Sequence, residues 1–390
     1  MEKNTFDVII MGAGLSGIGT ACHLQKNCKD KSYVILENRP SMGGTWDLFR
    51  YPGIRSDSDM FTLGYNFKPW KHKESIAGGG VILDYIKETA AENKIDKNIR
   101  FNSKIIRADW NTETSTWTVT CHDNVIKKEI KYHAKYVISC LGYYNYDHAH
   151  QPKFKEEKKF KGEILHPQFW PENLDYSNKE VVIIGSGATA VTLLPAMTDK
   201  AKHVTMLQRS PTYIASIPNR SLIPQAFLKN LPMDVQYGLN RAAQIGLQIS
   251  SYNLCQKQPE LMKMYFRQHV KKQLPKGYDI DKHFTPKYNP WDERLCAVPN
   301  GDMFKAIRSG KASVVTDHID KFVEDGILLE SGKKIKADII VTATGLELQM
   351  LGGVKTYMDG KEFKASDGIV YKGTMIKDIP NFAFILGYTN

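Results

Sequence analysis

Residues 6–17 read Phe-Asp-Val-Ile-Ile-Met-Gly-Ala-Gly-Leu-Ser-Gly, and this stretch decides the fold. The apolar run at 6–11 predicts a buried strand, and the glycine-rich turn at 12–17 leads into a helix that we expect over residues 18–27. A further apolar run at 33–36 predicts the next strand. Together these segments predict a βαβ unit, which is the building block of a parallel sheet.

The turn has the glycine spacing of sites that bind the pyrophosphate of a dinucleotide. Gly12 permits the tight turn, Gly14 lets the backbone approach the phosphates, and Gly17 lets the helix pack closely on the strand. The start of the helix, including Ser16, then presents N–H groups and partial positive charge to the phosphates. Glu37 follows the second strand, where an acid binds ribose hydroxyls. The alternative is a glycine-rich loop used only for packing.

A second copy of this pattern begins at residue 181. We expect a strand at 181–184, a turn at 185–190, a helix at 191–199 and a strand at 203–207. Between the two copies, alternating polar and apolar segments predict an antiparallel excursion that returns to a parallel sheet. Two dinucleotide turns in one chain, the first at the N-terminus, are the pattern of an FAD enzyme that is reduced by a pyridine nucleotide.

The second turn differs from the first at the ribose end of its nucleotide. Where the first copy has its acid, the second copy has Gln-Arg-Ser at 208–210. An acid there would repel a 2′-phosphate, whereas Arg209 can grip it bidentately and Ser210 adds a hydroxyl donor. The second nucleotide is therefore predicted to be NADP(H), the alternative being that Arg209 is a solvated charge at a strand end. The other residues expected to bind it are Gly185, Gly187, Thr189 and Ala190.

The chain is predicted to be an α/β protein with two Rossmann-like dinucleotide-binding domains, for FAD and NADPH, and a helical insertion. Residues 218–286 carry helical periodicity and few strand signals, with prolines near both ends. The predicted division is 1–150 for the first part of the FAD domain, 151–217 for the linker and first part of the NADPH domain, 218–286 for the helical insertion, 287–345 for the second part of the NADPH domain and 346–390 for the second part of the FAD domain.

Composition excludes several classes of protein. With 42% hydrophobic and 24% charged residues, the 390-residue chain can form two apolar cores and is neither disordered nor collagen-like. The net charge of +11 is spread along the chain with no aromatic-basic motif, so nucleic acid is not an expected partner. The six cysteines form no CxxC pair and have no metal-ligand spacing, so we expect no metal and a reducing, cytoplasmic compartment.

No integral membrane segment is expected. The uncharged stretches at 8–25 and 181–198 are long enough to suggest one, but closely spaced glycines break both. Near the end of the helical insertion, Lys271, Lys272 and Lys276 are predicted to form a solvated face. Peripheral contact of these lysines with anionic lipid is the alternative.

Two longer motifs resemble those of a known family. Residues 160–171 match FxGxxxHxxxWP, the fingerprint of type I Baeyer–Villiger monooxygenases, and residues 43–57 resemble the companion motif of that family. The matching fingerprint positions are Phe160, Gly162, His166, Trp170 and Pro171. The segments most similar to the ethionamide-activating subgroup are 56–60, 142–147, 288–296 and 387–390. The resemblance covers essentially the whole chain.

The resemblance implies an enzyme that uses FAD, NADPH and O₂, through a C4a-peroxyflavin, to convert linear or aryl-alkyl ketones to esters and to oxidise thioethers or thioamides. By the match of its segment, Arg294 is implied to be the catalytic cation beside the reacting oxygen, and Asp57 the acid that holds and tunes it. Gly44, Thr45 and Trp46 are implied to bind FAD together with Asp57. The alternatives are a structural ion pair for Arg294 and a loop cap for Asp57.

Within the fingerprint, His166 titrates near neutrality, but the resemblance implies that it supports the linker between nucleotide domains rather than transferring a proton. Phe160 and Trp170 are expected to anchor the core. Glu293 stands where several relatives carry a lysine that holds the 2′-phosphate, so the expected preference for NADPH depends more on Arg209.

The sequence leaves two other functions open. One is an N- or S-oxygenating flavin monooxygenase that forms no ester, against which the Trp170-Pro171 pair argues; the other is a non-catalytic nucleotide-binding protein. A disulfide reductase would need a redox cysteine pair, which the sequence lacks. The resembling family continues past the terminal Gly-Tyr-Thr-Asn, so we expect an incomplete FAD domain and weakened retention of FAD.

Overall fold

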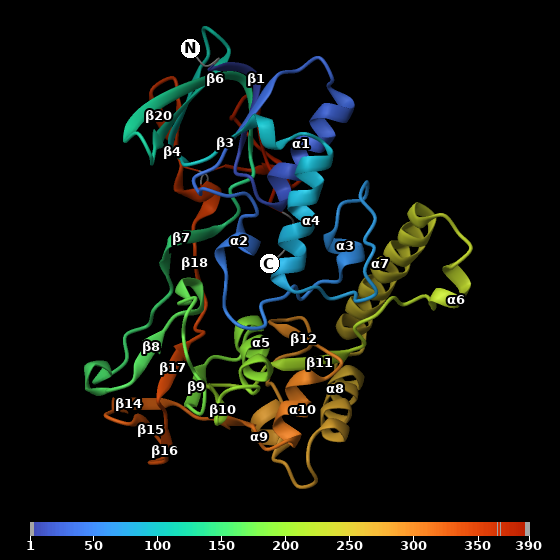
Figure 1. Cartoon of the computed structure of the whole chain (residues 1–390), viewed down its shortest axis with the longest axis vertical. Helices are drawn as coiled ribbons and strands as arrows, with labels where there is room; N and C mark the ends of the chain where they lie inside the picture. The colour runs from blue at the N-terminus through green and yellow to red at the C-terminus, as the bar shows by residue number, and fades with distance from the viewer. Residues whose placement is uncertain (1–3, 365, 367, 387–390) are drawn as a thin grey trace. The chain divides into compact units, whose positions relative to one another are not determined.

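A computed structural model describes residues 4–364, 366 and 368–386, and its backbone forms two compact units (Figure 1). Unit 1 takes its described residues from Met1–Leu48, Gly80–His148 and Leu346–Asn390, and unit 2 consists of Phe49–Gly79 and Ala149–Gly345. Residues 49–79 therefore group with unit 2, whereas the division inferred from sequence kept them within 1–150. The glycine-rich turns mark the two nucleotide folds, but no motif marks the point at which the chain crosses between them.

Unit 1 is built on a mixed sheet. Its described strands run in the order β20-β19-β4-β5-β6-β1-β2-β3, and β23 also pairs with β6. Their bounds are β1 Thr5–Met11, β2 Tyr33–Leu36, β3 Ile99–Arg100, β4 Ser103–Asn111, β5 Thr116–Asp123, β6 Lys128–Ser139, β19 Lys355–Met358, β20 Lys361–Phe363 and β23 Phe382–Phe384.

Strand β6 joins the two halves of this sheet. Its first part pairs antiparallel with β5, and its last part pairs parallel with β1 and β23. This arrangement confirms the predicted antiparallel excursion that returns to a parallel sheet. The core beneath it is aromatic, because the fully buried Trp117 ring lies 5.6 Å from Trp110 and 5.8 Å from Phe382, centroid to centroid.

Short elements complete unit 1. Strand β7 pairs with β18, and β21 pairs antiparallel with β22. The remaining bounds are α1 Leu15–Asn27, α2 Thr45–Leu48, α4 Gly79–Glu92, η1 Asp96–Asn98, β7 Tyr144–Ala149, β18 Leu346–Leu348, η4 Met350–Gly353, β21 Val370–Tyr371 and β22 Met375–Ile376. Helix α4 begins at the residue where the chain passes from unit 2 back to unit 1.

Unit 2 is built on a parallel sheet whose described strands run in the order β13-β10-β9-β17-β8. A parallel pair, β11 and β12, and an antiparallel sheet, β14-β15-β16, accompany it. The bounds are β8 Glu163–Leu165, β9 Glu180–Ile184, β10 His203–Gln208, β11 Tyr213–Ile217, β12 Leu295–Pro299, β13 Ala312–Thr316, β14 Ile319–Val323, β15 Gly326–Leu329, β16 Lys334–Lys336 and β17 Ile339–Thr342.

The helices of unit 2 include the predicted insertion, which appears as α6–α9. The bounds are α3 Met60–Leu63, η2 Glu157–Lys159, η3 Pro167–Phe169, α5 Ala188–Met197, α6 Gln225–Leu228, α7 Met233–Lys257, α8 Pro259–Gln273, α9 Ile280–Phe284 and α10 Asp302–Arg308. Lys271, Lys272 and Lys276, at and just after the end of α8, are exposed. In the described part of the chain no helix has both the length and the apolar character needed to cross a membrane.

The two nucleotide folds repeat the same backbone geometry. In unit 1 the N–H of Gly12 donates to the Leu36 carbonyl at 2.8 Å, and in unit 2 the N–H of Gly185 donates to the Leu207 carbonyl at 2.8 Å. Each glycine-rich turn therefore follows the end of one strand, β1 or β9. Its first glycine bonds the end of the neighbouring parallel strand, β2 or β10. The structure confirms the predicted α/β class with two Rossmann-like folds and a helical insertion.

Replacing Gly185 with alanine tests the backbone of the second turn. Gly185 has a φ of 136°, and an added Cβ would overlap the carbonyl oxygen of Ala343. We expect Gly185→Ala to lower the free energy of unfolding by at least about 1 kcal/mol and to lower the apparent Tm. The control is Gly238→Ala on α7, where nothing lies within 4 Å of the added Cβ. Its Tm should stay unchanged or rise, because alanine favours the helix.

Candidate functional site

The first glycine-rich turn connects β1 to α1. Gly12 has a φ of 95°, and an added Cβ would lie 2.7 Å from the carbonyl oxygen of Cys140, so only glycine fits there. An added Cβ at Gly17 would overlap the carbonyl oxygen of Gly12. Helix α1 begins after Gly14 with no side chain capping it, and the half-buried Ser16 lies in its first turn. This end of α1 fits a phosphate group.

Glu37 lies buried at the end of β2, as a ribose-binding acid should. Its Oε2 accepts from the N–H of Ala13 at 2.7 Å, and its Oε1 accepts from the N–H of Arg39 at 2.9 Å. Burial raises the pKa of Glu37, although these two hydrogen bonds favour the charged form. Each carboxylate oxygen keeps a further lone pair, so the pair of oxygens fits the two hydroxyls of a ribose.

The companion motif lies against this turn. Gly44 has a φ of 56°, and an added Cβ would lie 3.1 Å from the Cα of Gly14 and 3.5 Å from the hydroxyl of Tyr146, so the two backbones approach closely where only glycine fits. Thr45 begins α2, and its Oγ1 lies 3.3 Å from the hydroxyl of Tyr146. Trp46 follows on α2 and is half-buried. The structure therefore brings Gly44, Thr45 and Trp46 to the first turn.

Sequence reasoning missed the ion pair that holds this corner of unit 1. Asp47 is buried, and its Oδ2 accepts from Nη2 of Arg39 at 2.6 Å. Because the backbone of Arg39 also donates to Glu37, one residue fixes both the ribose-binding acid and helix α2. Asp47 stands inside the quoted motif at 43–57, but no sequence signal identifies Arg39 as its partner.

The side chain of Arg294 lies against the second glycine-rich turn. Helix α5 begins after Gly187 with no side-chain cap, the half-buried Thr189 lies in its first turn, and Ala190 is buried beneath. An added Cβ at Gly187 would overlap Nη1 of Arg294, so the guanidinium lies directly against the backbone of the turn. The predicted catalytic arginine and the predicted NADPH turn thus form one cluster within unit 2.

At the ribose end of this site, Gln208 occupies the place that Glu37 has in unit 1. The Gln208 side chain is buried, and its Nε2 donates to the Thr316 hydroxyl and to a backbone carbonyl, each at 2.8 Å. No acid is therefore present at this strand end. Arg209 and Ser210 follow and are exposed, and Arg209 makes no hydrogen bond or ion pair with any other described residue. Its guanidinium is available for an anion.

Asp57 lies in the same unit as Arg294 and within its electrostatic influence. Asp57 is accessible to solvent, but the crowding of protein atoms around it raises its pKa, while the positive charges of Arg55 and Arg294 act in the opposite direction. Neither Asp57 nor Arg294 forms an ion pair or a side-chain hydrogen bond with another described residue. The loop cap is Asp59 instead, which accepts from the N–H of Thr62 at 3.1 Å.

The backbone around Arg294 is held by aromatic hydroxyls. Tyr288 donates its hydroxyl to the Arg294 carbonyl at 2.9 Å, and Tyr213 donates its hydroxyl to the Tyr288 carbonyl at 2.9 Å. The Sγ of Cys296 lies 3.9 Å from the carbonyl oxygen of Ser186 in the second turn. The exposed guanidinium therefore projects from a well-anchored segment.

Tyr51, another residue that sequence reasoning missed, connects the companion motif to the second turn. Its ring is buried, its hydroxyl hydrogen-bonds Thr189, and burial raises the pKa of Tyr51 to about 12. Two residues later, Gly53 has a φ of 74°, and an added Cβ would lie 2.5 Å from the Cβ of Ala196 on α5. Tyr51 and Gly53 thus both pack on α5, and the segment that they begin, which carries Asp57, belongs to unit 2.

The fingerprint residues form the edge of the unit 2 sheet. Phe160 is buried with its ring 6.4 Å from that of Phe322, and an added Cβ at Gly162 would overlap the carbonyl oxygen of Asp338. Trp170 is only half-buried, contrary to the core position expected for it, and Pro171 is exposed.

His166 is buried and makes two hydrogen bonds. Its Nδ1 accepts from the N–H of Gln168 at 3.1 Å, so Nε2 carries the proton and lies 3.3 Å from the carbonyl oxygen of Gly345. Burial lowers the pKa of His166, which keeps the ring neutral. Gly345 is the last residue of unit 2 before the chain crosses to unit 1. His166 therefore holds the backbone just before the chain leaves unit 2 at Gly345.

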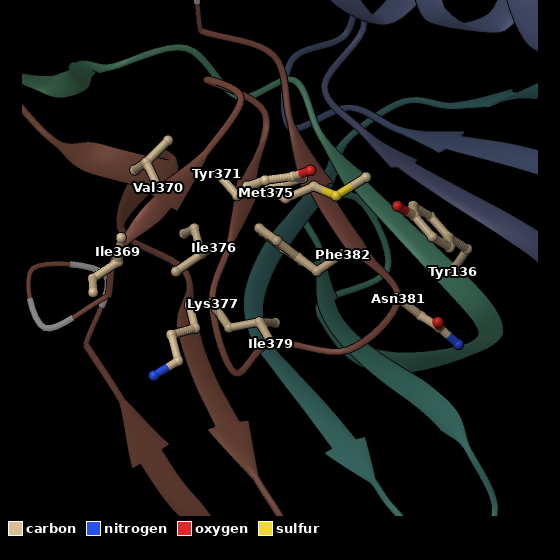
Figure 2. Close-up of a pocket in the computed structure, with 10 residues that line it drawn as sticks. All are labelled: Tyr136, Ile369, Val370, Tyr371, Met375, Ile376, Lys377, Ile379, Asn381 and Phe382. Atoms are coloured by element: carbon tan, nitrogen blue, oxygen red, sulfur yellow. The ribbon is translucent and has the colours of Figure 1, made fainter.

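A cavity of about 580 Å³ lies in unit 1, away from these residues (Figure 2). Tyr136 of β6 and Phe382 of β23 line it together with Met375 and Ile376 of β22. None of the predicted nucleotide-binding residues lines this cavity, and its walls are mainly apolar. It is therefore separate from the residues predicted to bind FAD.

Known proteins agree with this geometry. A family model described as pyridine nucleotide-disulphide oxidoreductase matches residues 9–231, which is more than half of the chain. The FAD-containing monooxygenase EthA of Mycobacterium tuberculosis is 53% identical over 385 residues, covering 98% of this chain and 78% of the relative. EthA of Mycolicibacterium smegmatis is 52% identical over 386 residues, covering 99% and 78%.

Solved structures show the same fold. Cyclohexanone monooxygenase from Rhodococcus sp. Phi1 bound to NADP⁺ matches with a TM-score of 0.76 and 20% identity, over 99% of this chain and 80% of that chain. The two glycine-rich turns, one on a mixed sheet and one on a parallel sheet, define a two-dinucleotide oxidoreductase fold. The chain belongs to the pyridine nucleotide-disulphide oxidoreductase family and, within it, to the FAD-containing monooxygenases. The 387–390 match noted in the sequence lies outside the described residues.

The pKa shift of His166 predicts how stability depends on pH. Because the folded pKa is lowered, the unfolded chain binds the proton more readily, and stability falls as the pH drops below the ordinary histidine value. His166→Gln keeps one acceptor and one donor but does not titrate. Its Tm should therefore fall less than that of the wild type between about pH 7.5 and about pH 5.5.

The control is His318→Gln, at an exposed site of the same unit, whose Tm should fall by as much as that of the wild type. Equal losses in all three proteins would contradict the prediction.

Proposed function

We propose that this flavin monooxygenase is a Baeyer–Villiger enzyme that inserts one oxygen atom of O₂ beside the carbonyl of linear or aryl-alkyl ketones. The balanced reaction converts ketone, O₂, NADPH and a proton to ester, NADP⁺ and water. The observation that carries the proposal is the unpaired guanidinium of Arg294 against the second turn, with the Asp57 carboxyl within its electrostatic influence.

The two turns fit two different nucleotides. FAD suits the first turn, because the buried Glu37 can accept ribose hydroxyls and the start of α1, which no side chain caps, can accept the pyrophosphate. NADPH suits the second turn, because a neutral glutamine replaces the acid and Arg209 offers an unpaired cation for the 2′-phosphate. When bound, the two cofactors supply the hydride and the activation of O₂ on which a monooxygenase depends.

The residues of this chain supply positioning and charge. Arg294 provides a permanent positive charge for the negative charge that develops on the substrate oxygen, and the hydroxyl of Tyr288 holds its backbone in place. Asp57 is a positioning residue, since its carboxylate moderates the positive field of Arg55 and Arg294 without pairing with either. Tyr51 keeps the segment that carries Asp57 on α5.

Thioether or thioamide oxidation is a second activity of the proposed enzyme. A sulfur atom attacks an electrophilic oxygen and needs no carbonyl, so the two substrate classes separate the Baeyer–Villiger proposal from a purely N- or S-oxygenating enzyme. The complete chain, supplied with FAD, NADPH and O₂, should convert 2-octanone to an ester that carries one labelled oxygen from labelled O₂. Sulfoxide from a thioether without any ester would contradict the proposal.

Substitution of Arg294 tests the proposed charge. Arg294→Ala should lower ester formation by at least about 100-fold, since it removes a fixed cation from the developing negative charge. Arg294→Lys should recover only part of the rate, because an ammonium group lacks the planar fork. Product yield is measured by gas chromatography, and NADPH binding is titrated in parallel because Arg294 contacts the turn. The control is Lys305→Ala on an exposed face of α10. Wild-type ester yield in Arg294→Ala would contradict the role.

Substitution of Arg209 tests the choice of nucleotide. Arg209→Ala should weaken NADPH binding by about 10–100-fold, the loss expected for a charge-assisted hydrogen bond, and should leave NADH binding nearly unchanged. Calorimetric titration measures both affinities without any turnover. Lys179→Ala removes an exposed positive charge just before β9, at the end of the sheet away from the turn, and should change neither. Equal weakening of both nucleotides would show that Arg209 does not read the 2′-phosphate.

A further inference from the structure

The loop that carries Asp57 is held by its backbone rather than by Asp57 itself. The Asp57 side chain makes no hydrogen bond with another described residue, so its position follows that of the chain around it. The N–H of Gly79 donates to the Ile54 carbonyl at 2.8 Å. The N–H of Ser56 donates to the Ala77 carbonyl at 3.0 Å. The two sides of this loop therefore form one hydrogen-bonded unit.

Arg55, two residues before Asp57, ties the loop to the start of α10. Both terminal nitrogens of its guanidinium donate to the Asp302 carboxylate, Nη1 to Oδ2 and Nη2 to Oδ1, the second bond being 3.5 Å long. The Arg55 side chain is 12% exposed and the Asp302 side chain 30%. Two bonds fix the orientation of a pair as well as its distance. Because desolvation offsets much of the attraction within a mostly buried pair, its main effect is on geometry.

A second contact ties the other side of the loop to the same region. The N–H of Ile76 donates to Oδ1 of Asn219 at 2.6 Å, and Nδ2 of Asn219 donates to the Ile76 carbonyl at 3.2 Å. The N–H of Asn219 in turn donates to Oδ1 of Asn300 at 3.0 Å. Asn300 lies two residues before Asp302, so both sides of the loop are anchored at one short turn, residues 300–302.

Strand β12 connects this turn to Arg294. Arg294 directly precedes the strand, and residues 300–302 follow it. All five residues of β12 pair with β11, and the strand also contacts α5 (Figure 1). One well-held segment therefore carries the Arg294 cation at one end and the anchors of the Asp57 loop at the other.

We propose that Arg55 and Asp302 form a positioning pair that keeps the Asp57 carboxyl beside Arg294. This inference rests on the proposed roles of Asp57 and Arg294. Arg55 and Arg294 are the two cations whose charge reaches the Asp57 carboxyl. Asp302 occupies the Arg55 guanidinium, which leaves the Asp57 carboxylate to moderate the field of Arg294. Without Asp302, the freed guanidinium would compete with Arg294 for the same carboxylate.

A thiol at residue 57 tests this geometry without any turnover. In Asp57→Cys a nearby cation favours the thiolate, so adding Arg294→Ala should raise the thiol pKa by about one pH unit. With Asp302→Ala also present, Arg294→Ala should change that pKa by less than half as much, because the loop no longer holds residue 57 in place. The rate of alkylation against pH gives the pKa. Peptide mass spectrometry separates residue 57 from the exposed Cys28.

The control is Asp281→Ala, which removes the carboxylate of another arginine pair in unit 2, that with Arg267 of α8. It should leave the effect of Arg294→Ala on the thiol unchanged. Asp302→Asn keeps the shape of the side chain without its charge, and it takes the place of Asp302→Ala if that variant does not fold. An Arg294→Ala effect of equal size with and without Asp302, or no effect in either background, would overturn the proposal.

Ester formation gives a second readout, which a purely structural role would not satisfy. Asp302→Ala should lower kcat by at least about 10-fold through misplacement of Asp57, with NADPH affinity nearly unchanged. In an Asp57→Ala background the same substitution should lower kcat no further, because the pair acts through Asp57. Arg55→Lys keeps the charge and should retain more of the rate than Arg55→Ala.

The two readouts separate this inference from the proposed function. Losses from Asp302→Ala and Asp57→Ala that multiply in the double variant would show that the pair does not act through Asp57, and would overturn the positioning role. A wild-type chain that forms no ester would contradict the proposed function instead. The thiol measurement would then still decide whether Asp302 keeps residue 57 beside Arg294.

Discussion

A side chain of even one carbon at residue 187 would overlap the guanidinium of Arg294, and the site of unit 2 depends on this close approach. The glycine that we propose gives a nucleotide access to the start of α5 also gives a permanent cation access to the same backbone. A cation and a helix N-terminus then present positive charge to one place. Such a place favours anionic groups, whether a cofactor phosphate or an oxygen that becomes charged during a reaction.

The second constraint is the path of the chain between residues 48 and 80. The companion motif begins at the first turn in unit 1 with Gly44 and continues onto α5 in unit 2, where Tyr51 bonds Thr189. One continuous motif therefore serves both nucleotide folds. His166 bonds the last residue of unit 2, since its neutral ring lies 3.3 Å from the carbonyl oxygen of Gly345, just before the chain returns to unit 1.

Helix α7 shows how polar contacts can determine which surface a protein exposes. Backbone carbonyls near α3 attract Tyr237 and Arg241, and each hydrogen bond formed there turns the apolar side of the helix outward. A buried carbonyl without a donor is costly, so this rotation is favourable even though it leaves apolar area in water.

The sequence by itself determined the two dinucleotide turns, the α/β class, the helical insertion and the exchange of an acid for Gln208 and Arg209 at the second ribose. These features are local: strand, turn and helix follow within about 30 residues, and glycine spacing reports backbone conformation directly. Only the tertiary structure decided that residues 49–79 join unit 2, that Arg39 pairs with Asp47, that Trp170 is only half-buried, and that Arg294 lies on Gly187 without pairing with Asp57. Each of these depends on contacts between distant segments, and no periodicity within one segment encodes its partner.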